Sequence, residues 1–197
     1  MKKSKKAVET KNLSIGWGEV HVLNQLNFEL NVGEKLAIVG PSGSGKSTIL
    51  KILAGLILPT QGELKIFGEK QNYLRLDQIN PPDVRLVFQN PALLGSLTIA
   101  ENVGFLLKRN KKISKKKIHE IVCECLAEVG LFNIENKLPS ELSGGMQKRV
   151  SFARALITDP TLNSKAKPLL LFDEPTAGLD PIASSRIEDL INKTNDK

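Results

Sequence analysis

The run Gly40–Thr48 carries the clearest chemistry in the sequence. It reads GPSGSGKST and fits the pattern G-x-x-x-x-G-K-[ST]. Glycines let backbone N–H groups approach a phosphate closely, and a helix that follows them points its positive end at the same group. Lys46 is then expected to neutralise terminal phosphate oxygens, and the Ser47 hydroxyl to ligate Mg²⁺. The predicted phosphate site consists of Gly40, Pro41, Ser42, Gly43, Ser44, Gly45, Lys46, Ser47 and Thr48.

A second candidate lies in Leu169–Glu174, which reads LLLFDE. A buried strand that ends in two carboxylates places them at the carboxyl edge of a sheet, where α/β folds bind ligands. Asp173 suits a Mg²⁺ ligand, directly or through water, and Glu174 suits a base that polarises an attacking water. A strand that runs into an acidic turn is common, so this motif gains its meaning from its pairing with the phosphate loop.

These groups need elements that position them, and the sequence predicts an α/β alternation. Short apolar runs bounded by turn residues indicate strands, and longer ones with helical spacing indicate helices. The predicted strands are Val20–Leu23, Leu26–Leu30, Lys35–Val39, Gly62–Phe67, Val84–Phe88 and Pro168–Asp173, and a buried helix is predicted over Ser47–Leu58, ended by Pro59.

The middle of the chain is predicted to be helical. Thr98 and Glu101 form a capping-box pattern, and Ser114–Val129 shows apolar residues at helical spacing. Ser143 opens another predicted helix, and Pro181–Ile191 forms the last one. The order is therefore a β-rich start, an α/β unit, a helical insertion and a return to α/β.

Composition and charge limit the class of protein. A chain of 197 residues suits one domain, and no apolar run approaches the length of a membrane span. We therefore expect a soluble, cytoplasmic protein. The net charge of +7 is concentrated in Lys2–Lys6 and Lys108–Lys117. Such clusters can bind nucleic acid or anionic lipid, but stacking aromatics do not accompany them. We therefore interpret them as a solvated tail and a solvated loop, and expect no nucleic-acid partner. Cys123 and Cys125 are interpreted as reduced thiols.

Leu142–Met146 reads LSGGM and is followed by a basic helix. This motif resembles the signature of the ABC (ATP-binding-cassette) ATPases, and other motifs fall in that family's order. Trp17 lies where the family stacks an aromatic on adenine, although it could be an ordinary core or surface aromatic. Ser143 could simply be a helix N-cap. The residues that the resemblance adds are Trp17, Gln89 as the Q-loop residue, Ser143, Gly144 and Gly145 of the signature, and Ala177–Asp180 as the D-loop.

The resemblance implies a P-loop NTPase fold with a β-rich N-terminal part, a RecA-like parallel sheet and a helical insertion. It implies one domain over 1–197, with a helical subdomain at about 91–158. ATP and Mg²⁺ are the implied cofactors, with Glu174, Lys46 and Gln89 catalytic, and Ser47, Gln89 and Asp173 around the metal. It also implies a homodimer in which the signature of one copy covers the γ-phosphate of the other, and a membrane permease that the ATPase drives from the inner face of the membrane.

Several stretches resemble one branch of the family, the ATPases of Mla/MCE-type lipid transporters. The branch resemblance rests on Val84–Leu107, the LSGGMQKR segment and Asp173–Ile191. It implies a phospholipid or related apolar cargo and an MCE-type lipid-binding partner. An importer of amino acids or other small solutes, and a soluble ABC protein that acts on ribosomes or DNA, are the alternatives.

Two features depart from the family pattern. ABC ATPases carry a switch histidine beyond the D-loop, whereas the histidines of this chain are His21 and His119. The last core strands and the C-terminal helix of the family pattern are also missing. We therefore expect that the chain is a fragment or a truncated gene product, or that something else completes its sheet. We further expect that it binds ATP but hydrolyses it poorly. The second departure is the polar stretch Asp159–Pro168, which is expected to form a surface loop.

Overall fold

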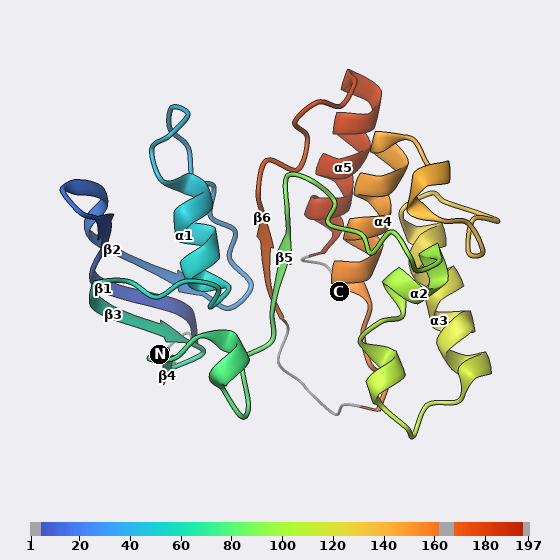
Figure 1. Ribbon diagram of the computed structural model, residues 1–197, viewed down its shortest axis with the longest axis horizontal. Helices are drawn as coiled ribbons and strands as arrows, with labels where there is room; N and C mark the ends of the chain where they lie inside the picture. The colour runs from blue at the N-terminus through green and yellow to red at the C-terminus, as the bar shows by residue number, and fades with distance from the viewer. Residues whose placement is uncertain (1–4, 162–167, 195–197) are drawn as a thin grey trace. The chain divides into compact units, whose positions relative to one another are not determined.

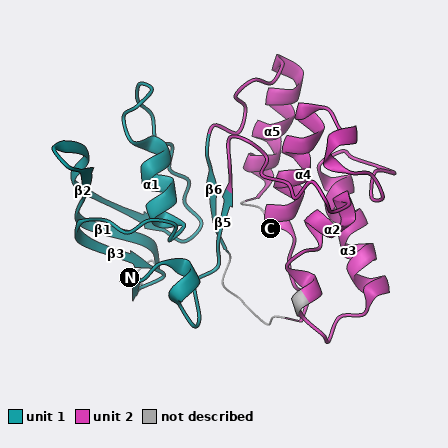
Figure 2. Cartoon of the chain, viewed as in Figure 1, with its two compact units in different colours: residues 1–86, 166–173 teal, residues 87–165, 174–197 magenta. Residues whose placement is uncertain are grey.

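The computed structural model describes residues 5–161 and 168–194 and divides into two compact units. Unit 1 comprises residues 1–86 and 166–173, and unit 2 comprises residues 87–165 and 174–197 (Figure 2). The division passes between Asp173 and Glu174, the two carboxylates predicted to do chemistry. The single domain predicted over 1–197, with its helical part at about 91–158, stays a prediction.

Unit 1 begins with an antiparallel sheet of four strands (Figure 1). The strands are β1 Lys6–Trp17, β2 Val20–Asn31, β3 Gln61–Ile66 and β4 Glu69–Lys70, in the order β2-β1-β3-β4. The pairing register places Val8 opposite Ile66, and both side chains are buried. One continuous strand, β2, stands where two short strands were predicted. Asn24 and Gln25, which the sequence pattern marks as a turn, lie within this strand because β2 pairs with β1 on both sides of them.

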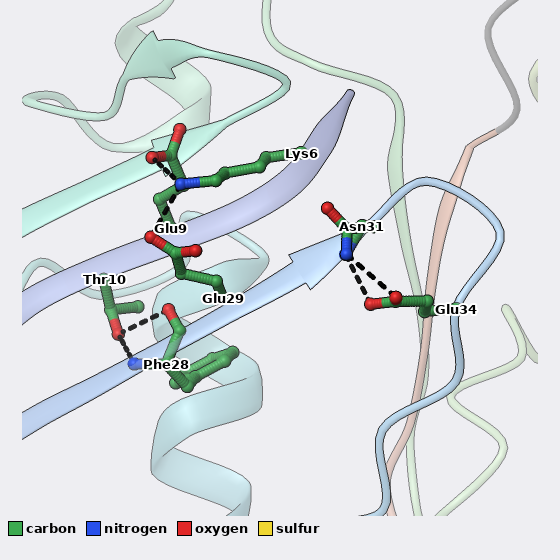
Figure 3. A network of polar contacts seen from close by, with 7 residues as sticks. All are labelled: Lys6, Glu9, Thr10, Phe28, Glu29, Asn31 and Glu34. Atoms are coloured by element: carbon green, nitrogen blue, oxygen red, sulfur yellow. Dashed lines mark hydrogen bonds and ion pairs between the residues drawn. The ribbon is translucent and has the colours of Figure 1, made fainter. Parts of the chain in front are cut away.

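Polar contacts join the ends of β1 and β2 (Figure 3). Lys6 Nζ donates to Glu29 Oε1 at 2.6 Å and to Glu9 Oε2 at 3.0 Å. The hydrogen bond with Glu29, followed by that with Glu9, raises the pKa of Lys6. Beside it, Thr10 Oγ1 accepts from the backbone N–H of Phe28 at 2.8 Å. These contacts set the register at the open end of the hairpin, while solvent exposure keeps the ion pairs individually weak.

The remaining elements of unit 1 are α1 Lys46–Leu53, the 3₁₀ turn Arg75–Asp77, and strands β5 Val84–Val87 and β6 Leu169–Phe172. The two strands lie side by side and run in the same direction (Figure 1). The backbone bond from Leu169 N–H to Asp83 C=O at 2.9 Å joins their starting ends. The predicted extension of the helix to Leu58 is wrong. Gly55 takes a φ of 69° just after the cap residue Ala54, so the helix ends well before Pro59.

The strand predicted over Lys35–Val39 is not present in the structure, which describes this stretch throughout. No ladder forms between the end of β2 and α1, and β5 pairs with β6 rather than with this segment. The Val39 side chain is 88% exposed, although the apolar run predicted a buried strand. A strand depends on a neighbour with free backbone groups, which local hydrophobicity cannot specify.

Unit 2 is helical and agrees closely with the sequence prediction. Its elements are α2 Ile99–Val103, the 3₁₀ turn Leu107–Arg109, α3 Lys115–Glu128, the 3₁₀ turn Pro139–Glu141, α4 Gly144–Leu156 and α5 Pro181–Lys193. Thr98 and Glu101 form the predicted capping box, and Ser114 and Ser143 cap α3 and α4. Local side chain-to-backbone bonds fix these helix starts, which explains why a sequence pattern could find them.

Asn102 organises the segment that leads into α2. Its side chain is fully buried, and its Oδ1 accepts from the Leu94 N–H at 2.7 Å. Its Nδ2 donates to the carbonyls of Leu94 at 3.0 Å, Leu97 at 3.1 Å and Thr98 at 3.0 Å. One amide therefore satisfies the backbone of a loop that has no ladder of its own.

Some predictions fall outside the described residues. These are most of the lysine cluster Lys2–Lys6 and residues 162–167 of the predicted surface loop. In the described part of the chain, no helix is long and apolar enough to cross a membrane.

We predict that Asn102→Ala lowers the free energy of unfolding by about 2–3 kcal/mol, because the Leu94 N–H loses its acceptor and the Leu97 carbonyl loses the donor that Asn102 supplies. Urea unfolding followed by circular dichroism measures this. Asn136→Ala, at an exposed turn of the same unit, is the matched control and should shift stability by less than about 0.5 kcal/mol. Equal stability of the two variants would contradict the role assigned to Asn102.

Candidate functional site

The phosphate loop Gly40–Thr48 folds back on its own lysine in unit 1. Lys46 Nζ donates to the carbonyl oxygens of Pro41 at 2.8 Å and Gly40 at 3.0 Å. An ammonium group has three N–H donors, so these two bonds hold it over the loop and leave a third for a further acceptor. The loop thereby places a positive charge beside its backbone N–H groups, which is the arrangement an anion requires.

Gly45 forms the junction between this loop and α1. Its φ is 91°, and a Cβ there would lie 2.9 Å from Leu23 Cδ2 and 3.1 Å from Val22 Cγ1. Both the left-handed backbone and the packing against β2 exclude a side chain. The first turn of α1 contains no acidic residue, so nothing in that turn offsets the positive end of the helix.

Ser47 and Asp173 meet in unit 1, although 126 positions separate them in the sequence. The Ser47 hydroxyl donates to Asp173 Oδ1 at 2.9 Å. A hydroxyl and a carboxylate side by side supply oxygen ligands of the kind that Mg²⁺ binds. The side chains that the structure brings together here therefore fit the predicted metal site.

Trp17 lies at the end of β1, where the hairpin turns into β2. Its partner across the ladder is Val20, and the two side chains are 57% and 65% exposed. The structure thus places a large aromatic surface open to solvent in the unit that holds the phosphate loop. The alternative that Trp17 is a core aromatic is excluded, while its stacking on adenine stays a prediction.

Gln89 and Glu174 meet in unit 2. Gln89 Nε2 donates to Glu174 Oε2 at 2.7 Å, which orients one oxygen of the carboxylate. The backbone of Glu174 has a φ of 43°, a left-handed conformation that costs a residue other than glycine about 1 kcal/mol or more. Such strain is concentrated at functional sites, where the position of a side chain matters more than its ease of folding.

Ser143 is the N-cap of α4, and its Oγ accepts from the Met146 N–H at 3.3 Å. The interpretation of Ser143 as a helix cap is therefore confirmed. At Gly144 a Cβ would meet nothing within 4 Å, and at Gly145 it would lie 3.7 Å from Leu179 Cδ2. The open space beside Gly144 leaves room for a ligand near the N–H groups of this helix end.

The D-loop Ala177–Asp180 connects Glu174 with α5. Asp180 caps that helix, and its Oδ1 accepts from the N–H groups of Ala183 and Ile182 at 3.0 Å each. The hydrogen bond from Ala183 is the main cause that lowers the pKa of Asp180, and that from Ile182 adds to it. The carboxylate that ends the D-loop is thus engaged as a helix cap.

Sequence reasoning missed two cations on α4 that hold neighbouring segments. Lys148 Nζ donates to the Ala177 carbonyl, and Arg154 donates to the carbonyls of Ala92 at 2.9 Å and Pro91 at 3.1 Å. Burial lowers the pKa of both side chains, and for Lys148 the charge of Glu174 opposes that shift. The sequence signal that could have identified Lys148 and Arg154 is their position on a helix whose opposite face is apolar.

The predicted residues divide between the two units, with a contact between Ser47 and Asp173 in unit 1 and a contact between Gln89 and Glu174 in unit 2. The phosphate loop, Asp173 and Trp17 belong to unit 1. Gln89, Glu174 and the signature Ser143–Gly145 belong to unit 2.

Comparison with known proteins extends this account. A family model described as "ABC transporter" matches residues 23–177. The chain is 50% identical over 189 residues to TRIGALACTOSYLDIACYLGLYCEROL 3 of Arabidopsis thaliana, covering 95% of this chain and 55% of that protein. It is 37% identical over 193 residues to the intermembrane phospholipid transport ATP-binding protein MlaF of Haemophilus influenzae, covering 96% and 70%. A probable ribonucleotide transport ATP-binding protein, mkl of Mycobacterium leprae, is 36% identical over 193 residues, covering 96% and 53%.

Among solved structures, the chain is similar to a dimeric, post-hydrolysis state of the ATP-binding cassette MJ0796 bound to ADP and Pi. The TM-score is 0.81 at 36% identity, covering 95% of this chain and 82% of that one. The predicted fold class, an α/β P-loop ATPase cassette with a β-rich N-terminal part, is thereby confirmed. The chain spans about half the length of the plant and mycobacterial relatives. The family model matches most of the chain, and that match includes the phosphate loop and the LSGG helix cap. The chain therefore belongs to the ABC transporter family.

Proposed function

We propose that the chain binds ATP with Mg²⁺ and hydrolyses it to drive an ABC transporter. The observation that carries the proposal is the hydrogen bond between Ser47 and Asp173, which joins the phosphate loop to the end of β6. A ligand that needs phosphate recognition and a hard cation together would account for both parts. The relative bound to ADP and Pi supports the same nucleotide chemistry.

In this proposal the loop's backbone N–H groups and the third N–H of Lys46 bind the terminal phosphates. Trp17 stacks on the adenine ring, since its exposed indole offers an apolar face in the same unit. Ser47 and Asp173 would hold Mg²⁺, with Gln89 as a further oxygen ligand, and the ion would supply charge neutralisation for the phosphate oxygens.

Hydrolysis would use the second group of residues. Glu174 accepts a hydrogen bond from the attacking water and increases its nucleophilicity, while Gln89 holds the carboxylate in one orientation. The water oxygen bonds to the γ-phosphorus, one water proton passes to the Glu174 carboxylate, and the bond to the bridging oxygen breaks, so that ADP and phosphate leave. The strained backbone of Glu174 fixes the carboxylate for this step.

A second copy of the chain would complete the site. Ser143, Gly144 and Gly145 of one copy would cover the γ-phosphate held by the other, because the N-terminus of α4 offers N–H groups and positive potential. The dimeric cassette to which the chain is similar supports this arrangement. ATP binding then favours the dimer, and hydrolysis releases it.

The transported cargo is proposed to be a phospholipid or a related apolar lipid. Two relatives support this: the MlaF protein is named for phospholipid transport, and the plant protein is named after a glycolipid. The chain would then act at the inner face of a membrane, with a permease and an MCE-type lipid-binding protein. The mycobacterial relative, named for ribonucleotide transport, favours a small solute as the second candidate.

The cargo can be tested by co-expressing the chain with a permease encoded beside its gene and reconstituting the complex in vesicles. ATP-dependent transfer of a fluorescent phospholipid is expected, while uptake of a nucleoside monophosphate in its place would support the second candidate. The Lys46→Ala complex is the control, because it separates transfer driven by ATP from passive exchange.

We predict that Lys46→Ala weakens ATP binding by about tenfold to a hundredfold, since a charge-assisted hydrogen bond contributes about 1.5–3 kcal/mol. Titration of a fluorescent ATP analogue measures the affinity. Lys51→Ala removes an exposed lysine from the same helix and should leave the affinity unchanged. An affinity that is equal in the two variants would refute the phosphate site.

We predict that Glu174→Gln retains ATP binding, lowers turnover by about a hundredfold or more, and gives a dimer with ATP on gel filtration. The glutamine can still bond to Gln89 but cannot act as a base. Glu188→Gln, an exposed position on α5, is the control with normal turnover. Elution of Glu174→Gln as a monomer at every ATP concentration would rule out the nucleotide-bridged dimer.

A further inference from the structure

Four lysines between α2 and the first turn of α3 form a basic surface that the proposed ATPase cycle does not use. We call Lys111, Lys112, Lys115 and Lys116 the lysine platform; all four are exposed. At its ends, Lys108 pairs with Glu101 and Lys117 pairs with Glu120, each at 3.1 Å. Within residues 5–161 and 168–194, the side chains of the platform have no ion pair or hydrogen bond.

The turn that carries the platform is folded and anchored. Leu107 and Ile113, on either side of it, are buried in unit 2. Asn110 Nδ2 donates to Thr161 Oγ1 at 2.6 Å and Asp159 Oδ2 at 2.8 Å. Its own Oδ1 accepts from the Lys112 N–H at 3.0 Å. Four like charges are thus held close together on a fixed surface, at an electrostatic cost that an external anion would relieve.

The start of α3 adds to that cost. Lys115 and Lys116 occupy its first turn, which contains no acidic residue. Cations at the positive end of a helix are unfavourable, and Ser114 alone provides the cap. The arrangement contrasts with β1, where Lys6 has two carboxylate partners.

Two exposed apolar side chains precede the platform by a few residues in the chain. Phe105 is 47% exposed and Leu106 is 50% exposed. They follow Gly104, which packs so closely on α3 that a Cβ there would lie 3.1 Å from Val122 Cγ2 and 3.2 Å from Ile118 Cγ2. This contact places the backbone just before the apolar pair against the first two turns of α3, and the first of these turns carries Lys115 and Lys116.

We propose that the lysine platform and the Phe105–Leu106 pair dock directly on the surface of an anionic phospholipid membrane. Such a surface presents phosphate head groups next to accessible hydrocarbon, which matches both parts of the patch. A nucleic acid would match the charge, but its bases need several aromatic platforms, and Phe105 is the single aromatic residue in 99–128. This contact is independent of nucleotide binding and of any permease.

The full chain is tested by flotation with vesicles of phosphatidylcholine alone and of phosphatidylcholine with about a third phosphatidylglycerol. Wild type should float with the anionic vesicles and lose most of that binding in high salt. The variant Lys111→Gln, Lys112→Gln, Lys115→Gln, Lys116→Gln should bind about a hundredfold or more weakly, since each lysine near such a surface contributes about fivefold and the four factors multiply. Phe105→Ser with Leu106→Ser should weaken binding while its salt dependence persists.

A matched variant replaces four exposed lysines elsewhere, Lys11, Lys51, Lys137 and Lys193, with glutamine, which changes the net charge equally. It should bind anionic vesicles within about twofold of wild type if the platform is the contact. Circular dichroism and ATP-analogue binding check that every variant is folded. Equal loss in the two lysine variants, no preference for anionic vesicles, or tighter binding to single-stranded DNA than to anionic vesicles of equal charge would each overturn the proposal.

Discussion

The hydrogen bond between Ser47 and Asp173 is the contact on which the candidate site depends. It joins the phosphate loop before α1 to the carboxyl end of β6, so two segments distant in sequence meet at one pair of oxygen atoms. Because a serine hydroxyl and an aspartate carboxylate are hard ligands, this pair is suited to hold a cation beside a phosphate bound in the loop, as proposed. Gly45 makes the contact possible, since its left-handed backbone lets the helix begin against β2.

In unit 2, α4 has the corresponding organising role. Ser143 caps its start, Lys148 binds the carbonyl of Ala177 in the D-loop, and Arg154 binds the carbonyls that follow the Q-loop. Two segments with little regular structure of their own are therefore held by side chains of one helix. Partly buried cations suit this task because a carbonyl oxygen offsets part of the cost of removing the charge from water.

The lysines of the chain differ in how their charge is balanced. Lys6 lies between two carboxylates, and Lys46 lies over the carbonyls of the phosphate loop. The four lysines of the platform, which lie just before α3 and in its first turn, have no carboxylate or carbonyl partner among the described residues. Unbalanced charge next to exposed Phe105 and Leu106 suggests a surface whose partner lies outside the chain, whereas the balanced lysines stabilise the fold or bind a ligand.

Features encoded by neighbouring residues were determined by the sequence alone. The phosphate loop, the capping box at Thr98 and the caps at Ser114 and Ser143 are local, so their residue types and spacing suffice to identify them. The pairing of Ser47 with Asp173, the contacts of Lys148 and Arg154, and the absence of a strand at Lys35–Val39 were decided by tertiary structure. Each depends on which backbone or side chain arrives from a distant part of the chain, and a strand exists only where a neighbouring strand offers its hydrogen-bonding edge.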